Sequence, residues 1–113
     1  MGIDPVESNP DLYHVVFENE RVRVLEYRDV PGTRSTPHHH PDSVMVTLSS
    51  FDRRLTSGER TVDVTLPEGK VVWVGEQSHF GENTGSTPTH VMLVELKEPA
   101  PNPREGESPL GPS

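Results

Sequence analysis

The stretch Gly32-Thr-Arg-Ser-Thr-Pro-His38-His-His40 places three consecutive histidines directly after a proline. We expect these histidines to enter a β-strand, in which successive side chains point to opposite faces. His38 and His40 then share one face, and His39 points away from them. Two imidazoles spaced in this way can both reach one metal ion, at Zn–N distances of about 2.0–2.1 Å. The stretch therefore predicts two ligands of a metal site.

A third histidine, His79, follows the apolar segment 71–74 and the break at Gly75. This position allows it to approach the first two from a neighbouring strand. Three neutral imidazoles with open coordination positions suit iron, zinc, nickel or copper better than magnesium or calcium. Spacing alone leaves an alternative open, in which the histidine cluster is a solvated polar patch and His79 is an ordinary surface or core residue.

The sequence on either side of these histidines consists of short β-type runs separated by turn residues. No window keeps an apolar period of 3.6 residues for long enough to indicate a helix. About eight short strands between glycine- and proline-containing turns are typical of an all-β sandwich or barrel. The runs occupy residues 12–17, 21–27, 43–48, 53–56, 61–66, 71–74 and 90–96, beside the histidine strand.

The chain of 113 residues is long enough for one domain, since domains usually span about 50–200 residues. We expect residues 1–10 to be an N-terminal arm with little to bury, and residues 11–97 to be the barrel. Residues 98–113 contain five prolines among scattered charges. Such a segment buries too little to offset its ordering entropy, so we expect a disordered tail.

The net charge of −8 argues against nucleic acid or anionic lipid as a partner. The absence of cysteine excludes disulfides and thiolate ligands, which fits a reducing compartment. The N-terminus lacks the pattern of a signal peptide, and no apolar run approaches the ~20 residues that span a bilayer. We therefore expect a soluble, cytoplasmic domain that binds a small molecule. Unpaired edge strands would favour a homodimer, although no residue selects one.

Two segments resemble the conserved motifs of the cupin superfamily. Gly32, followed after five residues by His38-His-His40, matches the opening of the first motif, Gly-x5-His-x-His. Gly69-Lys-Val-Val-Trp-Val-Gly75, continuing to His79-Phe-Gly-Glu-Asn83, is similar to the second. The motifs lie at the expected separation with a hairpin between them. The resemblance covers residues 12–97 and implies a small single-domain cupin, a jelly-roll barrel of the double-stranded β-helix type, with His38, His40 and His79 as metal ligands.

The chain departs from the cupin pattern at the fourth ligand. The usual glutamate would fall at Val44 or Met45, and neither side chain can ligate a metal. In the second motif Gly75 replaces proline and Gln77 replaces glycine. The resemblance is therefore closer to cupins that bind their metal through three histidines only, such as the diketone-cleaving dioxygenases. Asp42 offers an alternative carboxylate, if the histidine strand continues through Pro41, but a turn aspartate bonded to nearby backbone amides is its more ordinary role.

Several other residues are candidates for the site. His90 begins the last strand and would act as an acid or base if it faces the pocket with Met92 and Val94, whereas Tyr27 and Glu95 would do so if their strand faces point inward. Gln77 is a candidate to orient His79 or bind a ligand. Trp73 is a candidate to line the pocket, although core packing is its more ordinary role. The predicted catalytic residues are His90, Tyr27 and Asp42, and the predicted cofactor-binding residues are Gln77 and Trp73.

Three classes of function remain open. The first is an enzyme acting on a small molecule at one divalent iron, zinc or nickel ion, as a dioxygenase, lyase or isomerase. The second is a cupin that binds or senses a ligand without catalysis. The third is a metal-free cupin whose histidines perform acid/base chemistry on a sugar or nucleotide.

Overall fold

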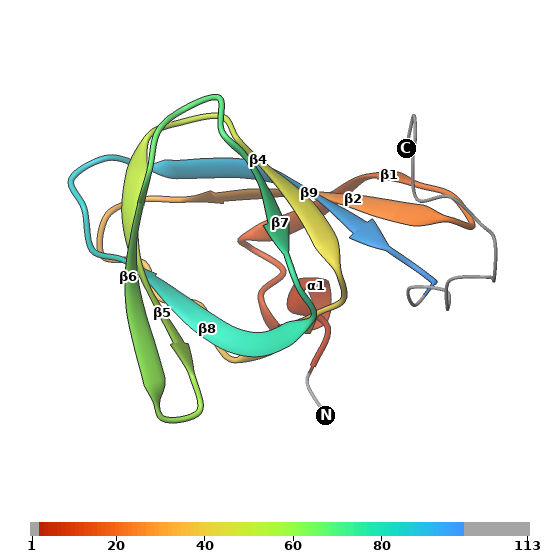
Figure 1. Cartoon of the computed structure of the whole chain (residues 1–113), viewed down its shortest axis with the longest axis horizontal. Coiled ribbons are helices and arrows are strands. Elements are labelled where there is room, and N and C mark those ends of the chain that lie inside the picture. The colour runs from red at the N-terminus through yellow and green to blue at the C-terminus, as the bar shows by residue number, and fades with distance from the viewer. Residues whose placement is uncertain (1–2, 99–113) are drawn as a thin grey trace, which may run out of the picture.

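A computed structural model describes residues 3–98, which form nine β-strands and one short helix (Figure 1). The strands build a barrel, with the helix against one end. The elements are α1 (Pro5–Ser8), β1 (Tyr13–Glu18), β2 (Val22–Asp29), β3 (His38–His40), β4 (Ser43–Thr47), β5 (Phe51–Ser57), β6 (Arg60–Leu66), β7 (Val71–Val74), β8 (Gln77–Asn83) and β9 (Thr89–Leu96).

Two antiparallel sheets make up the barrel wall. One has the strand order β1-β2-β9-β4-β7, and the other has the order β3-β8-β5-β6. Figure 1 shows β5, β6 and β8 curving around one side of the barrel, while β2, β9 and β4 form the other. Neighbours such as β2 and β9 are distant in sequence, as the jelly-roll topology requires. The predicted all-β barrel of the double-stranded β-helix type is confirmed.

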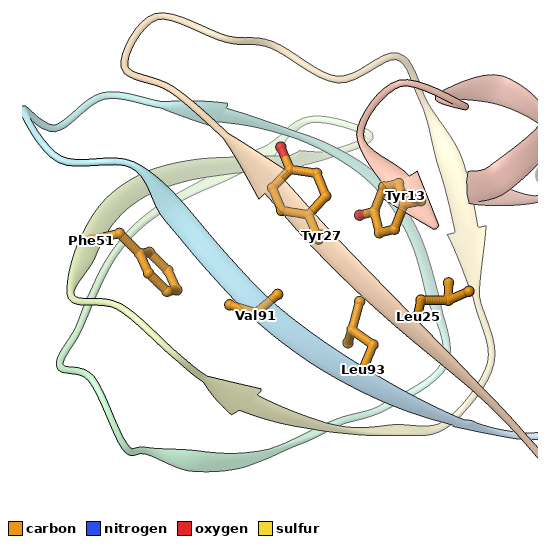
Figure 2. Close-up of a cluster of buried hydrophobic side chains, with 6 residues drawn as sticks. All are labelled: Tyr13, Leu25, Tyr27, Phe51, Val91 and Leu93. Atoms are coloured by element: carbon orange, nitrogen blue, oxygen red, sulfur yellow. The ribbon is translucent and has the colours of Figure 1, made fainter. Parts of the chain in front are cut away.

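The alternation of side chains along the strands sets the interior. In β9 the buried residues alternate with half-buried ones, so that Val91, Leu93 and Glu95 point inward. Figure 2 shows the apolar cluster in the barrel, with Tyr27 and Leu25 on β2 beside Val91 and Leu93 on β9. Tyr13 and Phe51 complete this cluster. Burying a side chain of this size contributes about 1.5–3 kcal/mol.

The remainder of the interior is polar. Among the described residues, more of the buried side chains are polar or charged than are hydrophobic. They gather toward the two ends of the β2–β9 pair, where Arg23 is opposite Glu95 at one end and Asp29 is opposite Thr89 at the other. In this part of the chain every buried side-chain nitrogen and oxygen has a hydrogen-bond partner. The apolar cluster thus lies between two ordered polar networks.

The turn before the histidine strand depends on one glycine. Gly32 has a φ of 89°, in the left-handed region that side chains with a Cβ avoid. Pro31 precedes it, and the Thr33 amide donates to the Val30 carbonyl at 3.0 Å to close a four-residue turn. Proline followed by glycine at the two central positions is typical of a type II turn. The turn directs the chain from β2 toward β3.

The strand predictions agree with the structure to within two residues at each end, with one exception. Residues 77–83 are not among the predicted runs but form β8. Residues 3–10 of the predicted arm contain α1, whose residue Pro5 is buried, so this segment buries more than its composition indicated. Residues 99–113 of the predicted tail lie outside the described residues. No helix within residues 3–98 has the length and apolarity to cross a membrane.

Candidate metal centre and adjoining cavity

The two sequence segments that carry the predicted ligands are paired strands. β3 runs antiparallel to β8, and His38 is directly opposite His79. His40 lies two residues further along β3 on the same face. One ring nitrogen of each histidine lies within 4.8 Å of the others. His38 and His40 are each 2% exposed, and His79 is half-buried, so the three imidazoles meet inside the barrel.

The Nδ1 atom of each of these imidazoles has a hydrogen-bond acceptor on the side away from the cluster. The His38 Nδ1 lies 2.7 Å from the Thr36 carbonyl oxygen, and the His40 Nδ1 lies 2.9 Å from Glu95 Oε2. These partners can only accept, so both Nδ1 atoms must carry the proton. The His79 Nδ1 lies 2.7 Å from Gln77 Oε1.

Gln77 is itself held in place, because its Nε2 donates to the Gly75 carbonyl oxygen at 3.0 Å. This bond fixes Oε1 as the acceptor for His79. All three histidines are therefore held in the tautomer that leaves Nε2 unprotonated. Such outward hydrogen bonds orient metal-binding histidines and raise their basicity. This arrangement fits a divalent metal, and it gives Gln77 the orienting role that the sequence suggested.

Tyr13 adds a hydroxyl group to the cluster. Its oxygen lies 3.2 Å from His38 Nε2 and 3.3 Å from His40 Nε2. A hydroxyl has one proton and can donate to only one of these nitrogens at a time. The unprotonated Nε2 atoms of the histidines thus present more lone pairs than the Tyr13 hydroxyl can satisfy. Converging lone pairs of this kind are what a bound cation requires. Burial raises the pKa of Tyr13, so the phenol keeps its proton.

Burial also keeps His38 and His79 neutral. It lowers the pKa of His38 to about 4. It lowers the pKa of His79 to about 3, with a further contribution from the neighbouring His40 and His38. Neutral imidazole is the form that binds a metal, so these two residues are ready to ligate at neutral pH.

The N-terminal segment supports the cluster from outside. The Asn9 side chain accepts from the Thr36 amide at 2.8 Å and donates to the Thr36 carbonyl at 3.2 Å. It therefore holds the carbonyl that receives the proton of His38 Nδ1. The arm predicted from sequence thus orients one of the three candidate ligands.

A chain of charges reaches the cluster from the helix. Asp4 caps α1 by accepting from the Val6 and Glu7 amides, and its Oδ1 lies 2.6 Å from Arg23 Nη2. The same nitrogen of Arg23 lies 2.8 Å from Glu95 Oε1. Because the other oxygen of Glu95 contacts His40, one guanidinium links the helix cap to a candidate ligand.

The three histidines border a cavity of about 300 Å³. Its walls are mostly apolar, with contributions from Leu55, Leu66, Val72, Val91 and Leu93. Met45 also lines the cavity. It faces inward from β4, and it is one of the two positions at which the resemblance places a glutamate ligand. A cavity of this size and polarity fits a small organic molecule.

A second polar network lies at the other end of the barrel. Asp29 is fully buried, and it accepts hydrogen bonds from the Tyr27 hydroxyl and from Arg53 Nη1. Asn83 Nδ2 and the Thr89 amide donate to its other oxygen at 3.0 and 3.3 Å. Tyr27 and Arg53 both line the cavity. Tyr27 thus points inward, which is the condition for its candidate acid/base role, but its hydroxyl is already engaged by Asp29.

Two of the predicted catalytic residues do not reach the cavity. His90 is on the outer face of β9, where its Nε2 lies 2.7 Å from Glu26 Oε2, because the inward positions of this strand are the odd-numbered ones. Asp42 accepts a hydrogen bond from the Glu76 amide at 2.9 Å and does not join the histidine cluster. A pocket-facing His90 and a ligating Asp42 are therefore wrong, and the backbone amide that Asp42 binds belongs to the distant residue Glu76 rather than to its own turn.

Trp73 is at the rim of the cavity and is 58% exposed. It alternates in β7 with the inward-facing Val72 and Val74, so the expectation that it packs in the core is wrong. The sequence reasoning missed Tyr13 and Arg53 as residues of the interior. Their inward orientation follows from strand alternation, but only once the inner face of β1 and β5 is known.

Comparisons with known proteins agree with the fold. No family model matches the sequence, and no curated protein is significantly similar to it. A solved cupin domain from Bordetella pertussis Tohama I is 29% identical, with a TM-score of 0.72 over 77% of this chain and 93% of that chain.

More distant solved structures share the architecture. A cupin with a double-stranded β-helix fold from Methanocaldococcus jannaschii is 15% identical, with a TM-score of 0.62 over 75% of this chain and 78% of that one. A polyketide cyclase from Streptomyces resistomycificus is 16% identical, with a TM-score of 0.56 over 79% and 66% of the two chains. At these identities the likeness concerns the fold alone.

Proposed function

We propose that this chain, a small cupin, is an enzyme that acts on a small organic molecule at one metal ion held by His38, His40 and His79. The observation that carries the proposal is the convergence of three imidazoles whose Nδ1 atoms all donate outward. A purely structural histidine cluster has no need of three such acceptors. The adjoining cavity of about 300 Å³ provides space for a substrate beside the metal.

The donor set indicates the class of metal. Three imidazole ligands without a carboxylate suit iron, zinc or nickel, and leave coordination positions open for substrate oxygen atoms. When bound, the ion would supply Lewis-acid chemistry or, in the case of iron, one-electron chemistry with oxygen. We favour this class of function over a purely structural metal, because a structural zinc site is normally closed by four protein ligands.

Residues of the chain itself would complete the site. Tyr13 lies within hydrogen-bond distance of two candidate ligands and retains its proton, so it can donate to an oxygen atom that develops charge beside them. The apolar walls exclude water from the reacting molecule. We assign proton donation to Tyr13 rather than to Tyr27, whose hydroxyl already donates to Asp29.

A metal-free acid/base enzyme is the second candidate. The contacts between the Tyr13 hydroxyl and two imidazoles favour it, because they form a connected path for a proton in the absence of any ion. The metal content of the protein distinguishes the two candidates.

The test is elemental analysis of protein purified without a metal-affinity tag, before and after incubation with Fe²⁺, Zn²⁺ and Ni²⁺. We expect close to one ion per chain, lost in His38→Ala. His39→Ala is the matched control, since His39 is the adjacent residue but contacts Ser78 and Glu76 on the outer face. It should retain the metal. Equal metal content in both variants, or none in the native protein after incubation, would contradict the proposal and leave the acid/base candidate.

A further inference from the structure

The cavity contains an unusual distribution of charge. Among the described residues that line it, Arg53 is the one permanently charged side chain, and no carboxylate lines the wall. The remaining lining is apolar, apart from the histidines, two tyrosines and a few small polar groups. The Arg53 side chain is 11% exposed. A guanidinium in such a cavity is a candidate site for an anion, because its planar fork of donors matches the geometry of a carboxylate.

The interactions of Arg53 leave part of its donor set available. Its Nη1 donates to Asp29 and to Thr89 Oγ1, and its Nη2 donates to the Tyr27 hydroxyl. A guanidinium has five N–H groups in all. Within residues 3–98 the three bonds therefore leave two N–H groups without a protein acceptor.

Asp29 does not depend on Arg53 alone. The Asn83 side chain and the Thr89 amide donate to its Oδ1, and the Tyr27 hydroxyl donates to its Oδ2. Neutral donors thus share the carboxylate charge with Arg53. Asp29 anchors the guanidinium through Nη1, and the two N–H groups without a protein acceptor are left for a ligand.

One glycine creates the space that the guanidinium occupies. A Cβ atom added at Gly81 would lie 2.5 Å from Arg53 Nη2 and 3.2 Å from a methyl group of Leu55. Gly81 follows His79 by two residues on the inward face of β8. Two residues of a strand span about 6.6 Å, so the guanidinium and the histidine cluster are neighbours along one wall.

We propose that the cavity binds a small organic carboxylate, with its carboxylate on Arg53, its apolar body against the barrel wall and a second oxygen toward the three histidines. The position of that second oxygen rests on the proposed metal function. The pairing of the carboxylate with Arg53 does not, since it requires no ion. The class of ligand is thus an apolar or aromatic acid that is short enough to bridge two neighbouring inward positions of β8.

The test measures the binding of benzoate and hexanoate, and of the neutral amides of the same shape, by calorimetric titration of the metal-free protein. We expect each acid to bind at least about tenfold more tightly than its amide, the usual size of a hydrogen bond to a charged group. The same titrations are repeated with Zn²⁺ and with His38→Ala. The preference for the acid should survive in His38→Ala, which separates this proposal from the metal assignment.

Two variants test the role of Arg53. Replacing Arg53 alone would leave Asp29 buried without its cation, so the pair is neutralised together in Asp29→Asn/Arg53→Gln. This variant should lose the preference for the acid. In Gly81→Ala the charge is retained but the guanidinium is displaced, and the preference should fall several-fold. Melting curves report whether each variant is folded.

Equal affinity for acid and amide in the native protein, or no binding of any probe, would overturn the proposal. A preference for the acid that persists in folded Asp29→Asn/Arg53→Gln would overturn it as well. No metal binding by the native protein, together with a preference for the acid, would overturn the proposed function and leave the carboxylate site standing.

Discussion

The barrel contains two buried carboxylates, one at each end of the β2–β9 pair, and they have different roles. Glu95 has a side chain that is 3% exposed and contacts Arg23 and the candidate ligand His40. Asp29 is fully buried and contacts Arg53, which lines the cavity. The carboxylate near the metal centre thus orients a histidine, whereas the carboxylate at the far end anchors an arginine.

The difference lies in what surrounds each arginine. Arg23 is 18% exposed and contacts a second acid, Asp4, so its charge is shared between two carboxylates and solvent. Arg53 is 11% exposed, and Asp29 is its one carboxylate partner among the described residues. The same pairing of an arginine with a buried acid therefore produces an arginine shared between two carboxylates at one end and an arginine with a single carboxylate beside the cavity at the other. The number of acidic side chains in contact with each arginine therefore decides its role.

The largest expected effect is the loss of unfolding free energy when one of the two buried carboxylates is removed. Asp29→Ala leaves Arg53 buried without a counterion, and breaking a buried pair in this way costs about 3–5 kcal/mol of unfolding free energy. Glu95→Ala leaves Arg23 with Asp4 and with access to water, so we expect a smaller loss of about 1–3 kcal/mol. Denaturant unfolding of the metal-free variants measures both values. Equal losses would show that the two arginines are in equivalent environments, and the opposite order would show that Arg23 depends more on its buried carboxylate than Arg53 does.

The second-largest expected effect is a pH dependence of the unfolding free energy that arises from the histidine cluster. Because the pKa of His38 falls from 6.5 unfolded to about 4 folded, the unfolded chain binds the proton first as pH falls. The stabilising contribution is complete above pH 6.5 and is lost as pH falls toward 4, at about 1.4 kcal/mol per pH unit for one imidazole. Unfolding of the metal-free protein at pH 7, 6 and 5 measures the slope.

His38→Gln is the variant for this measurement, and His39→Gln is its control. The slope should become shallower in His38→Gln and remain unchanged in His39→Gln, since His39 is on the outer face of β3. An identical slope in all three proteins would assign the pH dependence to other groups, such as His79, and contradict the role of His38.

The outer strands and the histidine cluster were the predictable part of the molecule. Segments such as 21–27 and 61–66 alternate apolar and polar residues, and their strands were predicted correctly. The cluster of His38, His40 and His79 followed from the strand period between the first two and from the likeness of the motif around the third. Both signals are local in the sequence, so they can be recognised without knowledge of the fold.

The missed features depend on the inside of the barrel being polar. The inward residues of β8 are Gln77, His79, Gly81 and Asn83, so this strand has no apolar alternation to detect. Arg53 appeared as part of a short basic run, and only its register opposite Asn83 places it inside. The polar residues that give the interior its chemistry interrupt the alternation of apolar and polar residues from which strands are predicted.

The smallest effect concerns the link between the N-terminal helix and the metal end. Asp4 both caps α1 and contacts Arg23, and Asp4→Ala removes the two interactions together, for an expected loss of about 1 kcal/mol. Asp4→Asn keeps a side-chain oxygen for the cap and removes only the charge beside a partly exposed arginine, which should cost a few tenths of a kcal/mol.

Denaturant unfolding measures the two losses, and zinc titration of the same variants measures the effect on His40. If Asp4→Asn lowers zinc affinity without lowering stability, the charge of Asp4 acts through Arg23 and Glu95 on the ligand. If zinc affinity is the same in both variants and the native protein, Glu95 alone is sufficient to orient His40, and the orientation of this histidine does not depend on Asp4.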